Sequence, residues 1–297
     1  MKTLSFFTLF FTLLSCTKEL DLDIPALPQK VVVNSLFCPD SVMKIHVSLT
    51  AGIKEEKTQI VENATVKLYE DEILIKTITT QNNGFYNSFY HPQVGKNYKI
   101  EVAVPDFETV WAESKMPHLP TSVTGIYKII PQQVDEFGVY KTYTILTFTD
   151  DANTKNYYEV GSNSFRFEQT EETDESILSD SELDFNPRTY FFSDDLFNGQ
   201  QKKLFKQRGG RAEIDPWGNF FAEEFFLHDF KSVSEEYYNF RKSWTKHVFN
   251  QNTTAHYDDP TTLLFLGDPI EMYTNIQGGY GIFAGYNQQI IEVKYVE

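Results

Sequence analysis

The chain has 297 residues, with 26 Lys and Arg against 42 Asp and Glu, so its formal net charge is −16. This charge argues against a nucleic-acid surface, which needs clustered cations, and it disfavours binding to anionic membranes. Hydrophobic residues make up 41% of the chain and aromatic residues 15%, which is typical of a globular protein and excludes a low-complexity chain.

The first residues have the pattern of a bacterial export signal. Lys2 is followed by an apolar run from Leu4 to Leu14, which suits a signal-peptide core and is too short to span a hydrocarbon layer of about 30 Å. The sequence Leu13-Leu14-Ser15-Cys16 resembles the lipobox of bacterial lipoproteins. We therefore expect residues 1–15 to be cleaved and Cys16 to be acylated. An ordinary secretory signal that happens to contain a cysteine is the alternative.

Residues 16–30 have the composition of an acidic tether, closed by Pro25 and Pro28. The Lys18-Glu19 pair, followed by further acids, resembles the signal that exports lipoproteins of Bacteroidota to the outer face of the outer membrane. We expect a lipid-anchored outer-membrane protein that faces the cell exterior, with the periplasmic face as the alternative. The tether is long enough that the folded part need not touch lipid, so the lipid anchor is the expected membrane contact.

Cys38 has no cysteine partner if Cys16 is lipidated, so the sequence predicts no intrachain disulfide. It follows the apolar run of residues 31–37 and precedes Pro39. This position predicts a packed cysteine at a strand end rather than a nucleophile.

Residues 31–118 alternate apolar and polar side chains with period two, which predicts half-buried strands. Turn residues separate seven of them, at 31–37, 44–49, 65–69, 73–79, 85–89, 98–104 and 108–115. This spacing favours a β-sandwich. Asn63–Val66, Asn83–Tyr86 and Gly95–Tyr98 also look like the prealbumin-type, Ig-like sandwich of carboxypeptidase regulatory domains, and that resemblance implies a scaffold without catalysis.

Pro117 and Pro120 favour an extended linker, so we expect a second domain over residues 119–297. It should also be mostly β, with strands at 122–130, 140–149, 157–167 and 288–296. One amphipathic helix is expected to interrupt it. Ser232 and Glu235 fit a capping box, and Tyr237, Phe240, Trp244 and Val248 recur at helical spacing to form a core-facing stripe.

An acidic run without a cation occupies residues 168–186. Its spacing does not match an EF-hand loop, so we expect a solvated loop, with calcium binding as the alternative.

The sequence shows few residue patterns that are typical of catalysis. The sequence contains no HExxH and no GxSxG, and its histidines are scattered at positions 46, 91, 118, 228, 247 and 256. We therefore predict no metal site, no cofactor and no enzymatic activity. Two alternatives stay open. One is a glycan or peptide binding module that uses Trp111, Trp217 and Trp244, and the other is a hydrolase with a carboxylate pair.

The segment 273–286 combines glycines with aromatic residues, but its glycine spacing does not fit a GxGxxG phosphate loop. The glycines are expected to permit positive φ and close backbone approach. Tyr280, Phe283 and Tyr286 are the candidate partner-binding residues, because large aromatic side chains are enriched in binding hot spots. The competing interpretation is that they fill the protein's own core.

Residues 16–297 as a whole resemble a family of Bacteroidota lipoproteins classed as a domain of unknown function, DUF4249. The resemblance is carried by Val31–Leu36 with Pro39-Asp40, Asn63–Tyr69, Phe192–Gly199, Ser234–Tyr238 and Asn275–Phe283. Ser35 stands where relatives tend to carry glycine. Members are often encoded beside TonB-dependent receptors. The resemblance therefore implies a non-enzymatic accessory subunit of such an outer-membrane β-barrel, acting in uptake or outer-membrane assembly, and it supplies no catalytic residues.

The lipobox makes a direct prediction about Cys16. The Cys16→Ala variant should lose fatty-acid labelling and leave the membrane fraction, because acylation needs the cysteine thiol. Metabolic labelling with a radioactive fatty acid and membrane fractionation measure both effects. Undiminished labelling of the variant would contradict the assignment.

Overall fold

The computed structural model describes residues 28–52, 58–163, 190–208, 211–251 and 270–297. The predicted mostly β fold class is confirmed. The elements, in chain order, are β1 (Val31–Phe37), β2 (Lys44–Leu49), β3 (Thr65–Glu70), β4 (Ile73–Ile78), β5 (Gln81–Asn82), β6 (Phe85–Asn87), β7 (Asn97–Ala103), β8 (Val110–Lys115), β9 (Val123–Val134), β10 (Tyr140–Thr149), β11 (Tyr157–Asn163), β12 (Tyr190–Ser193), β13 (Gln201–Arg208), β14 (Ala212–Ile214), β15 (Phe220–Ala222), β16 (Phe225–Val233), α1 (Glu235–Gln251) and β17 (Tyr280–Tyr295).

The N-terminal unit is a sandwich of two sheets. Strands β4-β3-β7-β8 form one sheet, and β1, β2, β6 and β5 form the opposite one. Alternation along each strand turns its apolar side chains inward, so that Val33 of β1, Leu68 of β3 and Ile100 of β7 lie buried in one core. Tyr86 in β6 fills the same core and donates its hydroxyl to the carbonyl of Val61 at 2.9 Å.

The second unit is built from longer strands. Strand β10 lies between β9 and β13 in antiparallel register, and β11 lies between β12 and β16. Aromatic residues dominate the core that they enclose. Phe148 lies 4.9 Å from Tyr158 and 5.0 Å from Phe230, measured between ring centroids.

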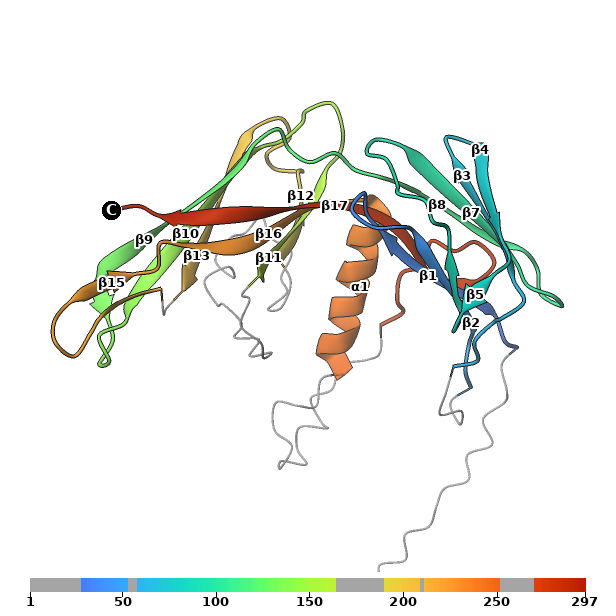
Figure 1. Ribbon diagram of the computed structural model, residues 1–297, viewed down its shortest axis with the longest axis horizontal. Coiled ribbons are helices and arrows are strands. Elements are labelled where there is room, and N and C mark those ends of the chain that lie inside the picture. The colour runs from blue at the N-terminus through green and yellow to red at the C-terminus, as the bar shows by residue number, and fades with distance from the viewer. Residues whose placement is uncertain (1–27, 53–57, 164–189, 209–210, 252–269) are drawn as a thin grey trace, which may run out of the picture.

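Strand β17 joins the two units into one frame, and Figure 1 shows it running along the arch between them. Its first part, 280–285, pairs in parallel with β1. Its middle, 286–294, pairs antiparallel with β16, and its end, 293–295, pairs in parallel with β9. The predicted final strand, 288–296, therefore begins eight residues earlier than expected, at Tyr280.

The same strand supplies buried side chains to three cores. Phe283 lies in the core of the N-terminal sandwich, and Ile291 lies in the aromatic core of the second unit. Ile282 and Ala284 point to the other face, where they pack with the start of α1. Ile276 and Phe283 thus pack in the core of the N-terminal sandwich, although they fall within the predicted C-terminal domain, 119–297. The domain boundaries remain a prediction.

Helix α1 begins at Glu235, and its N-cap is Ser234. The Ser234 hydroxyl accepts the amide of Tyr237 at 3.3 Å. The predicted cap, Ser232, is therefore wrong by two residues, because Ser232 still belongs to β16 and pairs with Tyr158. Tyr237 is buried, as expected for the apolar stripe, whereas Trp244 is 38% exposed. The side chain of Val248 and the acidic run 168–186 lie outside the described residues. No helix in the described ranges is long and apolar enough to cross a membrane.

Gly281 tests how tightly β1 and β17 pair. Its φ is +111°, and an added Cβ would lie 2.0 Å from the carbonyl oxygen of Val33. Gly281→Ala should therefore destabilise the fold by about 3 kcal/mol or more, measured by urea unfolding.

Gly218 provides the matched control for that substitution. Its φ is +88° and an added Cβ would meet nothing within 4 Å. Gly218→Ala should cost about 1 kcal/mol, which is the backbone strain alone. Equal losses in the two variants would contradict the close approach at Gly281.

Candidate functional site

The structure separates the three aromatic residues predicted to bind a partner. Phe283 is fully buried and packs on Phe37, with ring centroids 4.7 Å apart. Tyr280 is 42% exposed and lies under the ammonium of Lys30, 5.1 Å from the ring centroid. Tyr286 is half-buried and packs against the cluster that contains Ile282 and Ala284. Phe283 is thus a core residue, and only Tyr280 among the three presents a large exposed surface.

Asn275 holds Phe283 in this position. The Asn275 side chain accepts the Phe283 amide at 3.0 Å and donates to the Phe283 carbonyl at 2.7 Å. An added Cβ on Gly279 would lie 2.5 Å from the carbonyl oxygen of Val31, so this residue lets the chain approach β1 closely. The glycine-rich segment is therefore built for backbone packing, as expected from its sequence.

Tyr286 lies where β1, β17 and α1 meet. Its ring centroid is 5.8 Å from that of Tyr237, and the Lys231 ammonium lies 5.8 Å from its ring centroid. Burial, and next a hydrogen bond with Cys38, raise the pKa of Tyr286. Cys38 itself is buried at the end of β1, and its sulfur lies 3.3 Å from the Ser41 hydroxyl.

A buried charge cluster lies beside Tyr286 and centres on Glu159 of β11. The Glu159 carboxylate accepts the Tyr237 hydroxyl at 2.6 Å and pairs with Lys231 at 3.2 Å and Arg241 at 3.1 Å. Burial by itself would raise the pKa of Glu159, but the two cations and the hydroxyl more than offset it and hold that pKa below its usual value. The cluster ties α1 to β11 and β16.

Ser114 of β8 makes a second connection at this junction. Its hydroxyl lies 2.8 Å from the Glu236 carboxylate and 3.0 Å from the Ser234 hydroxyl, and it accepts the Gly285 amide at 3.2 Å. Ser234 also donates its amide to the Gly285 carbonyl at 2.9 Å. One serine thus links the N-terminal sandwich to the start of α1 and to β17.

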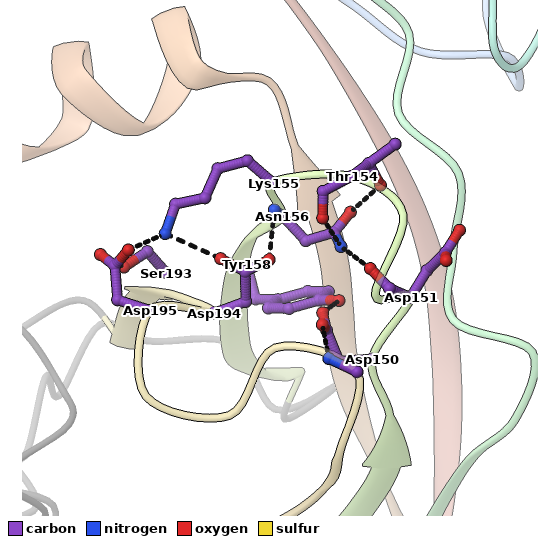
Figure 2. Close-up of polar contacts among 10 residues, drawn as sticks. Asp150, Asp151, Thr154, Lys155, Asn156, Tyr158, Ser193, Asp194 and Asp195 are labelled. Atoms are coloured by element: carbon purple, nitrogen blue, oxygen red, sulfur yellow. Dashed lines mark hydrogen bonds and ion pairs between the residues drawn. The ribbon is translucent and has the colours of Figure 1, made fainter.

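A third polar cluster fastens the loop after β10 to the loop after β12 (Figure 2). Asp150 accepts the Tyr158 hydroxyl at 2.5 Å and the Gly199 amide at 2.8 Å. Asp194 accepts the Asn156 amide at 2.7 Å and pairs with Lys155 at 2.8 Å. Burial, and next the bond to Asp150, raise the pKa of Tyr158. These carboxylates are engaged by groups of their own chain, which is the arrangement of a structural clamp.

The described residues hold no group of three or more His, Cys, Asp and Glu side chains that could bind a metal ion. Three of the described histidines contact a backbone carbonyl or an aromatic ring. His228 is buried with Nδ1 2.7 Å from the Gly161 carbonyl, and His247 Nδ1 lies 3.0 Å from the Ile270 carbonyl. His46 packs on Phe85, and burial lowers its pKa. His256 lies outside the described residues.

Sequence reasoning missed Glu159 and His228 as buried groups. Glu159 alternates with Tyr158 and Val160, so period two places it on the face of β11 expected to be solvated. His228 instead shares the buried face of β16 with Phe226 and Phe230, and alternation along that strand could have found it. For Glu159 the only signal for burial was indirect. Helix α1 covers that face of β11, and a helix long enough to do so could be read from the sequence.

The fold and its internally paired polar clusters define a β-rich scaffold of two units. The chain belongs to the family of the domain of unknown function DUF4249, whose model matches residues 17–291. No curated protein matches the chain.

Distant similarity to solved structures is found as well. An α2-macroglobulin mutant from Salmonella is 9% identical with a TM-score of 0.28, over 92% of this chain and 16% of that one. The MSCRAMM ACE of Enterococcus faecalis is 7% identical with a TM-score of 0.23, over 90% of this chain and 95% of that one. The chain thus spans about a sixth of the α2-macroglobulin. Similarity at this level carries no argument about function.

Glu159 yields a prediction for stability and its pH dependence. Glu159→Gln should destabilise the fold by about 3 kcal/mol at pH 7, because Lys231 and Arg241 then face each other without a counter-charge. The folded pKa is depressed, so the carboxylate's contribution is present above pH 4.5 and is lost as pH falls below it. Urea unfolding should therefore show that the difference in free energy of unfolding between wild type and variant is smaller in the acid range than at pH 7.

Glu292 is the matched control. It pairs with Lys294 at 3.1 Å, and both side chains are exposed. Glu292→Gln should change stability by less than about 1 kcal/mol. A pH-independent loss in Glu159→Gln would sink the electrostatic explanation.

Proposed function

We propose that this chain is a non-enzymatic, lipid-anchored protein on the exterior of the outer membrane. We further propose that it is an accessory subunit of a β-barrel of the TonB-dependent receptor type, in uptake or outer-membrane assembly. The lipobox at Cys16 and the resemblance to Bacteroidota lipoproteins support this reading. A protein tethered in the plane of the membrane meets a barrel at high effective concentration, so a modest interface suffices for a lasting complex.

The observation that carries the proposal is the free edge of β4. Among the described strands, β4 pairs with β3 and ends its four-stranded sheet. Ile73 is 72% exposed and Leu74 is 49% exposed at the start of this strand. Phe89, 75% exposed, lies near the same strand, with the Lys76 ammonium 5.7 Å from its ring centroid.

An edge of this kind is suited to a protein partner. A free strand edge presents unpaired amides and carbonyls that an extended segment of another chain can match. Natural proteins usually protect such edges with charges, yet β4 reads Ile-Leu-Ile-Lys-Thr-Ile and carries one charge, Lys76. The apolar side chains would add buried area to the backbone hydrogen bonds. We therefore assign β4 as the docking edge.

The polar clusters support a non-enzymatic role. The carboxylates of Asp150, Asp194 and Glu159 are each engaged by hydroxyls, amides or cations of the chain itself. A general acid or base needs a face open to substrate. For the alternative of a glycan or peptide binding module, the three tryptophans lie on separate elements. Trp111 is on β8, Trp244 is on α1, and Trp217 is in the turn between β14 and β15.

Affinity purification in mild detergent, from cells at native expression, tests the proposal. The wild-type chain should recover an outer-membrane β-barrel of the receptor type, identified by mass spectrometry. The double variant Ile73→Lys with Leu74→Lys should lose at least about nine-tenths of that barrel, because two charges are placed on the docking edge.

The control adds the same two charges elsewhere. Leu196 and Ile290 are 66% and 48% exposed and lie on the second unit. Leu196→Lys with Ile290→Lys should retain the barrel. Recovery of the wild-type chain alone, across several detergents, counts against the accessory-subunit function, and equal loss in both double variants counts against β4 as the interface.

A further inference from the structure

Two neighbouring hairpin turns of the second unit share one design. The first is Asp135-Glu136-Phe137-Gly138-Val139, between β9 and β10, and the second is Asp215-Pro216-Trp217-Gly218-Asn219, between β14 and β15. Each has the pattern Asp-x-aromatic-Gly. The aromatic residues at the third position are the most exposed large apolar side chains described, at 78% for Phe137 and 84% for Trp217.

The hydrogen bonds of the two turns are also the same. Asp135 Oδ1 accepts the amides of Phe137 and Val139, both at 2.9 Å. Asp215 Oδ1 accepts the amides of Trp217 and Asn219, at 3.0 and 2.8 Å.

The glycine of each turn completes the match. Gly138 has φ of +82° and Gly218 has φ of +88°, and each donates its amide to the carbonyl of its aspartate. Each turn therefore holds its aromatic residue outward on a fixed backbone, which lowers the entropy that binding would cost.

The two turns lie side by side. Val139 forms a β-bridge with Glu213, and the Ile214 amide donates to the Gly138 carbonyl at 2.9 Å. Phe220 continues the aromatic surface from β15 and contacts Tyr140 of β10, with ring centroids 5.9 Å apart. Phe137 and Trp217 are thus two projections on one rigid tip, backed by further exposed aromatic surface.

We propose that this tip inserts Phe137 and Trp217 into the surface of a lipid bilayer. Aromatic side chains, and Trp above all, prefer the boundary between headgroups and hydrocarbon. The aspartates of both turns face back into their own backbone, so the two projections are apolar. The bond to Asn219, and next the backbone amides, hold the pKa of Asp215 below its usual value.

The position of the tether favours lipid over a protein as the occupant. From Cys16 to Pro28, where the described chain begins, the fully extended chain reaches at most about 40 Å. Figure 1 shows the two hairpin turns and the first described residues on the same long side of the arch, at its opposite ends. If Cys16 is acylated, as proposed above, the tether lets this side of the arch, and with it the tip, lie on the membrane that holds the chain. The tip adds a second membrane contact to the lipid anchor expected from the sequence.

Charge does not drive this contact. Glu136 lies within the first turn and Glu213 lies two residues before the second, and the chain has a formal net charge of −16. Anionic headgroups would repel these carboxylates. The contact is therefore made by insertion of the aromatic side chains, and vesicles of a zwitterionic lipid isolate that contribution.

The test uses the lipidated full-length chain on phosphatidylcholine vesicles that contain brominated acyl chains, which quench nearby tryptophan. Because the chain has three tryptophans, Trp111→Phe with Trp244→Phe leaves Trp217 as the sole emitter. Its fluorescence should fall by at least about half. The reciprocal control, Trp217→Phe with Trp244→Phe, reports from Trp111 on β8 and should lose less than about a tenth.

A second pair of variants keeps the result specific to the tip. In the protein with Trp217 alone, Phe137→Ser should reduce the quenching at least about twofold, because one of two anchors is lost. Phe89→Ser, an equally exposed site on the N-terminal unit, should leave it unchanged. Unquenched Trp217, or equal quenching of Trp217 and Trp111, overturns the proposal. Either result is independent of whether a barrel co-purifies.

Discussion

One strand, β17, holds the two units of this protein together. Strand β17 pairs with β1 at one end and with β16 and β9 at the other, and its side chains enter three separate cores. Because the same strand is hydrogen-bonded to both units, no flexible linker lies between its two parts. The backbone hydrogen bonds to one unit therefore also fix the residues that pair with the other. The two units are therefore expected to move together as one rigid arch rather than as independent domains.

Buried polar contacts reinforce the crossing point of that strand. Glu159 fastens α1 to β11 and β16, and Ser114 fastens β8 to the helix start and to Gly285. A buried ion cluster contributes little net stability compared with an apolar packing, but it permits one geometry because a misplaced charge would be left unpaired. Here Glu159 fixes α1 on the strands of the second unit, and Ser114 fixes the N-terminal sandwich to the start of that helix.

The arch separates two exposed surfaces of different chemistry. The edge of β4 offers unpaired backbone with aliphatic side chains, which suits another strand, and the hairpin tip offers two fixed aromatic projections, which suit a lipid surface. A chain tethered and docked as proposed would rest its tip on the membrane and would offer β4, on the other unit, to a neighbour in the same plane. Rigidity along β17 makes the two contacts mutually supportive, because neither must be reordered when the other forms.

Local patterns in the sequence were sufficient for most strands and for the one helix. Period-two alternation located β1, β2 and β10 to the residue, because burial on one face of a sheet is a local consequence of side-chain direction. The glycine-rich segment was also understood locally, as a place of close backbone approach.

The same patterns could not show which strands and helices pack against one another. The sequence shows that Phe283 is aromatic and Glu159 is charged, but not that β17 returns to β1, nor that α1 covers β11. Those pairings join residues more than seventy positions apart, and they decided that Phe283 is core and that Glu159 is buried. Strand pairing at such range depends on the whole set of competing contacts, so only the tertiary structure settles it.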